Sequence, residues 1–300
     1  MRYICPSALT KGDTIGLVTP SSPILQSRLE SGISYLKNKG LKIKLGNNLQ
    51  KSQRFLAGSD EERAEDIMSF FMDEEVKGIM ATGGGYGSQR ILPFLNYDLI
   101  RANPKWVTGF SDTTALQSGL LKKAGLISCS GFVFGDLDNG TPNPSIEQSL
   151  MACLANKSFQ ITEGIMVQSG IAQGPLVGGN LESLIALMGT PYQPDFNNCI
   201  LLIEDVGAEP YQVDSRLSQL ALAGIYEQIA GVVFGQFTHC NAKYFPNRDG
   251  TVEDVINEWS SRVKVPCIKE FPYGHMERRY VLPLGKTARL NADNTVLSIL

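Results

Sequence analysis

Residues 105–123 read KWVTGFSDTTALQSGLLKK, and this stretch predicts the architecture of the chain. The β-prone run Trp106–Thr108 comes directly before Gly109, and apolar residues then recur at helical spacing over Ala115–Leu121. The pattern indicates a strand, a tight turn and a helix. At such a turn a serine, here Ser111, can stand at the top of a sheet with its hydroxyl exposed.

Two interpretations of this turn remain open on the local pattern. A functional serine would suit it, because the backbone N–H groups after Ser111 begin a helix, lack partners and can face developing negative charge. Alternatively, Ser111 or Asp112 only caps the helix, which is a common role for both residue types. The capping interpretation is the commoner one, since no complete G-x-S-x-G is present.

Composition narrows the class of protein. The chain has 300 residues, of which 43% are hydrophobic and 19% are charged, and this predicts a globular protein of two domains. A net charge of −3 without a basic block argues against nucleic acid or an anionic membrane as partner. The cysteines are scattered without a C-x-x-C, so we expect buried, reduced thiols and no metal site. With no signal-peptide pattern and no membrane-length apolar run, the expected location is the cytoplasm.

Short strand and helix patterns alternate along the first half of the chain. Such alternation predicts right-handed βαβ units, hence an α/β fold with an open, mainly parallel sheet and helices on both faces, flavodoxin- or Rossmann-like, over residues 1–150. The polar stretch at 151–174 suggests a linker. The longer intervals after it predict a smaller mixed α/β domain over residues 175–300.

Two glycine-containing turns fall at the carboxyl ends of predicted strands, where parallel sheets bind ligands. One is Gly109–Asp112, and the other is Gly83–Gly87, with sequence GGGYG. Stacked glycines expose N–H donors that could cradle a phosphate, but the phosphate-loop and dinucleotide fingerprints are absent. The same donors could equally bind an oxyanion.

Few residues could serve as a general base. The chain has two histidines: His275 follows a turn-like Pro-Tyr-Gly, and His239 follows an apolar strand pattern. A lone histidine is more often structural than catalytic. Glu204 and Asp205 end the apolar run Cys199–Ile203, where an acid could hold an imidazole or simply be solvated.

Ordered motifs along nearly the whole chain carry a family resemblance. The chain is similar to the LD-carboxypeptidase family of serine peptidases, which includes murein tetrapeptide and microcin C self-immunity peptidases. The matching segments are GDTIGLVTPSSP (12–23), GGYG (84–87), PKWVTGFSDTTAL (104–116), GGNLESLIALMGTPY (178–192), LLIEDVGAEPYQVD (201–214) and YGH…LPLG (273–285).

The resemblance implies a Ser–His–Glu triad, with Ser111 as nucleophile, His275 as base and Glu204 as the acid that orients it. It further implies an oxyanion hole of backbone N–H groups. Its candidates are Asp112 with Gly84 or Gly85.

The implied reaction is hydrolysis, through an acyl-enzyme, of the L,D-peptide bond before the C-terminal D-alanine of murein tetrapeptides. A small peptide is the expected substrate, a homodimer is possible, and neither a metal nor another cofactor is expected. An immunity-type peptidase acting on peptidyl- or aminoacyl-nucleotide analogues is the second candidate. A non-catalytic nucleotide- or sugar-binding protein is a third. A metallopeptidase is disfavoured because H-E-x-x-H is absent.

Two departures from the family pattern concern substrate recognition. Many murein-trimming members have an arginine where this chain has Gly83, and many read Asp-Arg where it reads Asp-Ser-Arg at residues 214–216. Arginine is the natural bidentate partner of a carboxylate. We therefore expect Arg278 or Arg279, just past His275, to receive the substrate's free carboxylate, with Tyr86 as a further contact.

Overall fold

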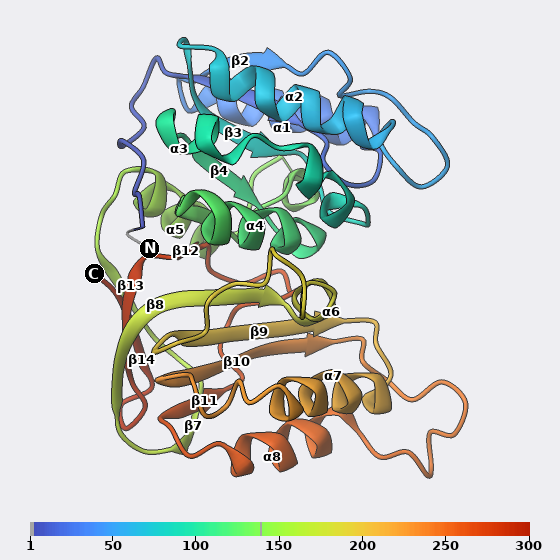
Figure 1. The fold of residues 1–300 in the computed structure, drawn as a ribbon, viewed down its shortest axis with the longest axis vertical. Coiled ribbons are helices and arrows are strands. Elements are labelled where there is room, and N and C mark those ends of the chain that lie inside the picture. Colours follow the sequence, from blue (N-terminus) through green and yellow to red (C-terminus); the bar gives the residue numbers. More distant parts are fainter. Residues whose placement is uncertain (1–2, 139) are drawn as a thin grey trace.

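The computed structural model describes residues 3–138 and 140–300, which form two sheets (Figure 1). The first sheet has the order β12-β5-β4-β3-β1-β2. Neighbouring strands among β1–β5 pair in parallel, and β12 is antiparallel to β5. The strands of this sheet are β1 (Thr14–Val18), β2 (Lys42–Leu45), β3 (Val76–Ala81), β4 (Trp106–Gly109), β5 (Ser128–Ser130) and β12 (Leu282–Leu284).

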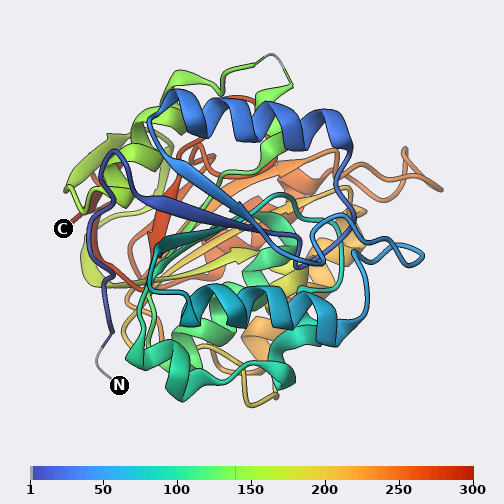
Figure 2. The same cartoon turned by 90° about the horizontal axis from the view of Figure 1, so that it is seen from above.

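Helices cover both faces of the first sheet. One hydrophobic cluster joins β1 to α1 and α5, and another joins β3 to α2, α3 and α4. Figure 2 shows α1 and α2 on opposite sides of the strands. The helical segments are α1 (Gln26–Asn38), α2 (Asp60–Met72), α3 (Tyr97–Ala102), α4 (Thr114–Ala124), α5 (Pro144–Leu154) and the 3₁₀ turns η1 (Ser88–Phe94), η2 (Ser111–Thr113) and η3 (Phe134–Leu137). The predicted open, parallel-rich sheet is confirmed.

The second sheet is mixed and has the order β6-β14-β13-β8-β9-β10-β11-β7. Strands β8–β11 are parallel, and the remaining pairings are antiparallel. Helices α7 and α8 pack on one face. The elements are β6 (Phe159–Thr162), β7 (Ile165–Gln168), β8 (Ile171–Asn180), α6 (Leu181–Ile185), β9 (Ile200–Val206), α7 (Pro210–Leu222), β10 (Gly231–Thr238), α8 (Val252–Arg262), β11 (Cys267–Lys269), β13 (Thr287–Asn291) and β14 (Val296–Ile299). This confirms the mixed α/β arrangement of the second half.

Residues 151–174, for which the sequence suggests a linker, contain regular secondary structure. This stretch holds the end of α5, strands β6 and β7, and the start of β8. Strands β6 and β7 are the two edges of the second sheet, have four residues each, and leave most of their side chains exposed. Runs this short and this exposed give only a weak strand signal in the sequence. The second sheet, which belongs to the domain expected to be smaller, has eight strands, whereas the first sheet has six.

The two sheets meet through α4, which lies between them in Figure 1. The backbone N–H of Asn180, at the end of β8, donates to Thr114 Oγ1 at 3.0 Å. Gly179 permits this approach, because a Cβ there would lie 2.5 Å from the same Oγ1 atom. The carboxyl ends of β4, β8 and β9 are thereby brought to one region.

No helix in the described part of the chain is both long enough and apolar enough to cross a membrane. All six cysteines are free thiols, and five of them are buried as expected. Cys5 is the exception, since it is exposed.

Candidate active site

Ser111 occupies a sharp turn between β4 and α4. Its φ of +65° lies in the left-handed region, which is strained for a residue with a side chain and is found most often at functional sites. Thr113 stabilises the turn by donating its hydroxyl to the Phe110 carbonyl at 3.0 Å. Gly109 has no room for a side chain, because a Cβ would lie 2.4 Å from Thr113 Oγ1.

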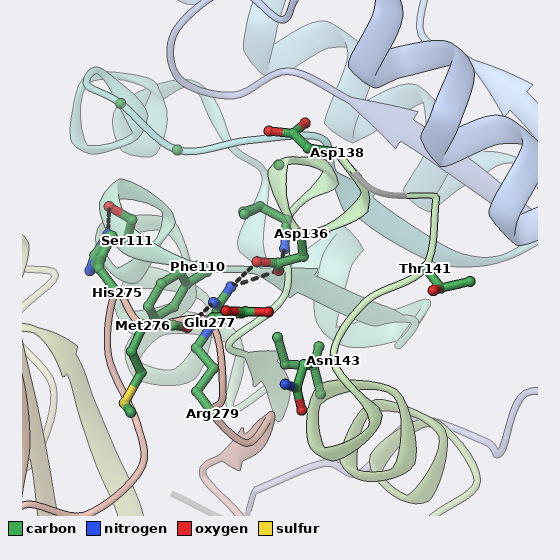
Figure 3. Close-up of a pocket in the computed structure, with 15 residues that line it drawn as sticks. Phe110, Ser111, Asp136, Asp138, Thr141, Asn143, His275, Met276, Glu277 and Arg279 are labelled. Atoms are coloured by element: carbon green, nitrogen blue, oxygen red, sulfur yellow. Dashed lines mark hydrogen bonds and ion pairs between the residues drawn. The ribbon is translucent and has the colours of Figure 1, made fainter.

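The structure brings Ser111, His275 and Glu204 into one hydrogen-bonded chain. His275 Nε2 lies 2.9 Å from Ser111 Oγ (Figure 3), and His275 Nδ1 lies 2.7 Å from Glu204 Oε2. The three residues come from the turn after β4, from the loop before β12 and from β9. With a proton on Nδ1 donated to Glu204, Nε2 can accept the serine proton, and this is the geometry of an activated nucleophile.

Glu204 is fully buried, and its second oxygen also has a partner. Asn180 Nδ2 donates to Glu204 Oε1 at 3.1 Å, while Asn180 Oδ1 accepts the backbone N–H of Ser183 at 3.1 Å. Asn180 therefore fixes the carboxylate and begins α6. Asn180 is not among the site residues predicted from the sequence, although its place at the end of the motif Gly178-Gly179-Asn180 is a usable signal.

Asp205, next to Glu204, points to a different partner. Arg216 Nη1 donates to its Oδ2 at 2.6 Å and also lies 3.4 Å from Glu182. Burial raises the pKa of Asp205 to about 6, and the nearby Arg216 opposes that rise. Arg216, which stands one position later than the arginine of the Asp-Arg pattern, thus pairs with a buried acid beside Glu204.

Arg279 holds the loop that carries His275. Its Nη2 contacts both oxygens of Asp136 at 2.6 Å, its Nε donates to Gly131 O at 2.9 Å, and its Nη1 donates to Met276 O at 2.8 Å. The Phe110 ring lies between the side chains of Arg279 and His275 (Figure 3). Its centroid is 4.6 Å from Arg279 Cζ and 4.6 Å from the centroid of the His275 ring.

The two arginines expected to receive a substrate carboxylate are therefore already engaged. Arg279 is buried in its pair with Asp136. Arg278 contacts Glu163 through two nitrogens at 2.5 and 2.6 Å and does not line the cavities at Ser111. His239 is exposed and is likewise absent from both cavity linings.

The glycine turn lies directly against Ser111. A Cβ on Gly84 would be 3.0 Å from Ser111 Cβ and 3.4 Å from its Oγ, so a side chain there would press on Ser111. Gly85 has a φ of +105°, and Tyr86 donates its N–H to Ser22 Oγ at 3.1 Å. The predicted oxyanion segment is thus beside Ser111. The Tyr86 ring is partly exposed and packs edge-on against Phe55.

Two cavities meet at Ser111. The larger, of about 610 Å³, lies on the side of Phe110, Asp136 and His275, and Figure 3 shows its lining. The smaller, of about 340 Å³, lies on the side of Tyr86 and Asn180. Within the described residues, no group of three His, Cys, Asp or Glu side chains is placed to hold a metal ion.

Comparison with known proteins agrees with this two-part architecture. Family models for the LD-carboxypeptidase N-terminal domain and C-terminal domain match residues 15–131 and 173–290 respectively. The chain belongs to the LD-carboxypeptidase family of peptidases.

Individual relatives match over almost the full length. A probable murein peptide carboxypeptidase of Bacillus subtilis is 33% identical, and the match covers 97% of this chain and 93% of that protein. The solved structure of muramoyltetrapeptide carboxypeptidase from Oxalobacter formigenes is 27% identical, with a TM-score of 0.86 over 95% of this chain and 98% of that one. A structure of MccF in complex with glutamyl sulfamoyl guanosine is 26% identical, with a TM-score of 0.88 over 98% of each chain.

Proposed function

We propose that this protein is a serine LD-carboxypeptidase that releases the C-terminal D-alanine of murein tetrapeptides. The observation that carries the proposal is the chain Ser111–His275–Glu204, hydrogen-bonded at the point where two cavities meet. A peptide bond attacked by Ser111 needs room on both sides of its carbonyl, and the two cavities supply it. The murein relatives support the choice of substrate.

The proposed reaction begins with attack of Ser111 Oγ on the carbonyl carbon while His275 Nε2 takes the hydroxyl proton. Glu204 holds the ring and stabilises its charged form. His275 then gives the proton to the amine of the departing D-alanine, which leaves an acyl-enzyme. Water, activated by the same histidine, hydrolyses the ester and restores Ser111.

Backbone N–H groups of Asp112 and of Gly84 or Gly85 stabilise the tetrahedral oxyanion in this scheme. The contact of Gly84 with Ser111 supports the assignment, because donors must lie about 3 Å from where the oxyanion forms. One such donor typically contributes about 2.7–4 kcal/mol to lowering the barrier. No metal or cofactor takes part in the proposed steps.

A second candidate is hydrolysis of an aminoacyl-nucleotide analogue by an immunity-type peptidase. Two observations favour it. The MccF relative binds a glutamyl sulfamoyl guanosine, and Arg279, the arginine that lines the larger cavity, is already paired with Asp136 and so is not available for a substrate carboxylate. A buried carboxylate without a partner costs several kcal/mol, so a substrate with a free carboxylate needs other donors here.

The deciding experiment is incubation with a murein tetrapeptide followed by mass analysis. We expect loss of one alanine from the D-alanyl peptide and none from its L-alanyl isomer. Amidation of the terminal carboxylate should lower kcat/KM by at least about tenfold, roughly 1.4 kcal/mol.

Two comparisons make the result interpretable. The variant Ser111→Ala controls for contaminating peptidases. Equal cleavage of acid and amide, or faster cleavage of a glutamyl sulfamoyl nucleoside than of the peptide, would contradict the murein assignment and favour the second candidate.

A further inference from the structure

The Asp112 side chain does not cap the helix that it precedes. Its carboxylate reaches across the site to another segment, accepting the backbone N–H of Gly87 at 3.1 Å and that of Ser88 at 2.8 Å. The Ser21 hydroxyl donates to the same carboxylate at 2.5 Å. Asp112 is buried. A buried carboxylate with three donors is a strong local anchor.

The segment that Asp112 holds is the glycine turn beside Ser111. Gly85 and Gly87 have φ values of +105° and +123°, so this turn relies on its neighbours to fix its course. Ser88 adds a reciprocal contact, donating its hydroxyl to the Asp112 carbonyl at 2.5 Å. The turn is therefore hydrogen-bonded to both the side chain and the backbone of Asp112.

Other contacts hold the turn to more distant parts of the first sheet. Ser22 donates its N–H to Gly84 O at 3.2 Å, and Arg63 donates to Gly87 O at 2.9 Å. Neither Ser22 nor Arg63 neighbours Ser111 in sequence. Asp112 is different, because it is covalently attached to the nucleophile and directly bonded to the glycine turn.

We propose that the Asp112 carboxylate is a positioning residue that sets the spacing between the two halves of the oxyanion hole. The inference rests on the proposed serine mechanism, in which the N–H of Asp112 and the N–H of Gly84 or Gly85 share one oxyanion. Such donors are effective only when preorganised about 2.7–3.1 Å from the oxyanion. Loosening the Asp112 contacts moves one half of the hole relative to the other.

The variant Asp112→Asn tests this, because an amide keeps the shape but can accept with only one of its two ends. We expect kcat to fall at least tenfold with KM within about twofold, since the hole acts on the transition state. Labelling of Ser111 by a fluorophosphonate, which also forms an oxyanion, should slow to a similar extent.

Asp66→Asn is the matched control. Asp66 is equally buried and accepts the backbone N–H of Asn48 at 3.0 Å and its side-chain amide at 3.1 Å, but it does not line the cavities at Ser111. We expect it to lower the melting temperature as Asp112→Asn does while leaving kcat and labelling unchanged. Ser21→Ala removes one donor to Asp112 and supplies a milder variant that should lower kcat in the same direction.

The outcomes separate the two proposals. If the wild-type protein neither cleaves peptide nor reacts with the phosphonate, the serine mechanism fails. If the wild-type protein reacts but Asp112→Asn and Ser21→Ala match it in kcat and labelling, or if Asp66→Asn loses as much activity, the positioning role is overturned.

Discussion

At the scale of single residues, the short contact between His275 and Ser111 distinguishes one histidine from the other. His275 Nε2 lies 2.9 Å from Ser111 Oγ, whereas His239 is exposed and outside the cavities. We predict that His275→Ala lowers kcat at least a thousandfold and that His239→Ala changes it by less than about twofold. The double variant Ser111→Ala/His275→Ala should be no slower than either single one. Steady-state kinetics check this, and equal losses for the two histidines would refute it.

Asp205 gives a prediction about pH and stability. Burial raises its pKa to about 6, whereas an unfolded aspartate titrates near 3.9, so the folded state binds more protons between these values. The stability contributed by this group is therefore complete below about pH 4 and is lost as pH rises through about 6.

The variant Asp205→Asn removes that titration. Its free energy of unfolding minus that of wild type should rise by about 2 kcal/mol between pH 4 and pH 7. Urea unfolding of both proteins across this range measures the difference. A difference that stays constant with pH would show that Asp205 does not titrate as proposed.

Residue chemistry visible in the sequence was enough to nominate Ser111, Glu204 and His275, helped by the resemblance to a family. The sequence motif around Asn180 could mark the residue but not its partner, and nothing local marked Arg216, because both roles depend on contacts with Glu204 and Asp205 made only after folding. The same applies to Arg278 and Arg279. Their proximity to His275 in sequence suggested substrate binding, while the fold pairs them with Glu163 and Asp136.

At the scale of elements, the loop before β12 positions His275 and is anchored by Arg279. Breaking a buried ion pair by removing one partner costs about 3–5 kcal/mol, and the Arg279–Asp136 pair is buried. We predict that Arg279→Met destabilises the fold by this amount and lowers kcat by at least tenfold, with partial recovery in Arg279→Lys. Chemical unfolding and kinetics measure both effects.

Arg278→Gln is the neighbouring control. Its pair with Glu163 is half exposed, so its loss should cost no more than about 1 kcal/mol. If Arg278→Gln proves as damaging as Arg279→Met, the buried pair of Arg279 with Asp136 is not what anchors the loop.

Elements with strong local patterns were predictable, and exposed edge strands were not. The helix at Asp60–Met72 begins with the capping box of Ser59 and Glu62 that its sequence indicates. Strands β6 and β7 present few buried side chains, so their existence depends on hydrogen bonds to β14 and β11. Each of these pairings joins segments far apart in sequence, so the local pattern of four residues does not reveal it.

At the scale of the whole molecule, a strand and a hydrogen bond from the second half of the chain connect it to the first sheet and its helices. Strand β12, from the second half of the chain, completes the first sheet beside β5, and Asn180 bonds to α4. We therefore predict that the two halves unfold together, since neither sheet keeps its contacts alone.

The two tryptophans allow a direct test, because both are buried and each belongs to one half of the molecule. Trp106 lies in β4 of the first sheet, and Trp259 lies in α8, which packs against the second sheet. In Trp259→Phe the fluorescence reports the first sheet, and in Trp106→Phe it reports the second. Within each variant, the urea midpoint from fluorescence should coincide with that from circular dichroism. Separated midpoints in either variant would indicate independent domains.

Covalent labelling reports directly whether Ser111 is a nucleophile activated by His275. The intact protein is treated with a fluorophosphonate, digested, and the modified peptide is identified by mass spectrometry. We predict one adduct on Ser111, no adduct in Ser111→Ala, and labelling slowed at least a hundredfold in His275→Ala. Labelling at another residue would rule out Ser111 as the nucleophile, and an unchanged rate in His275→Ala would rule out its activation by His275.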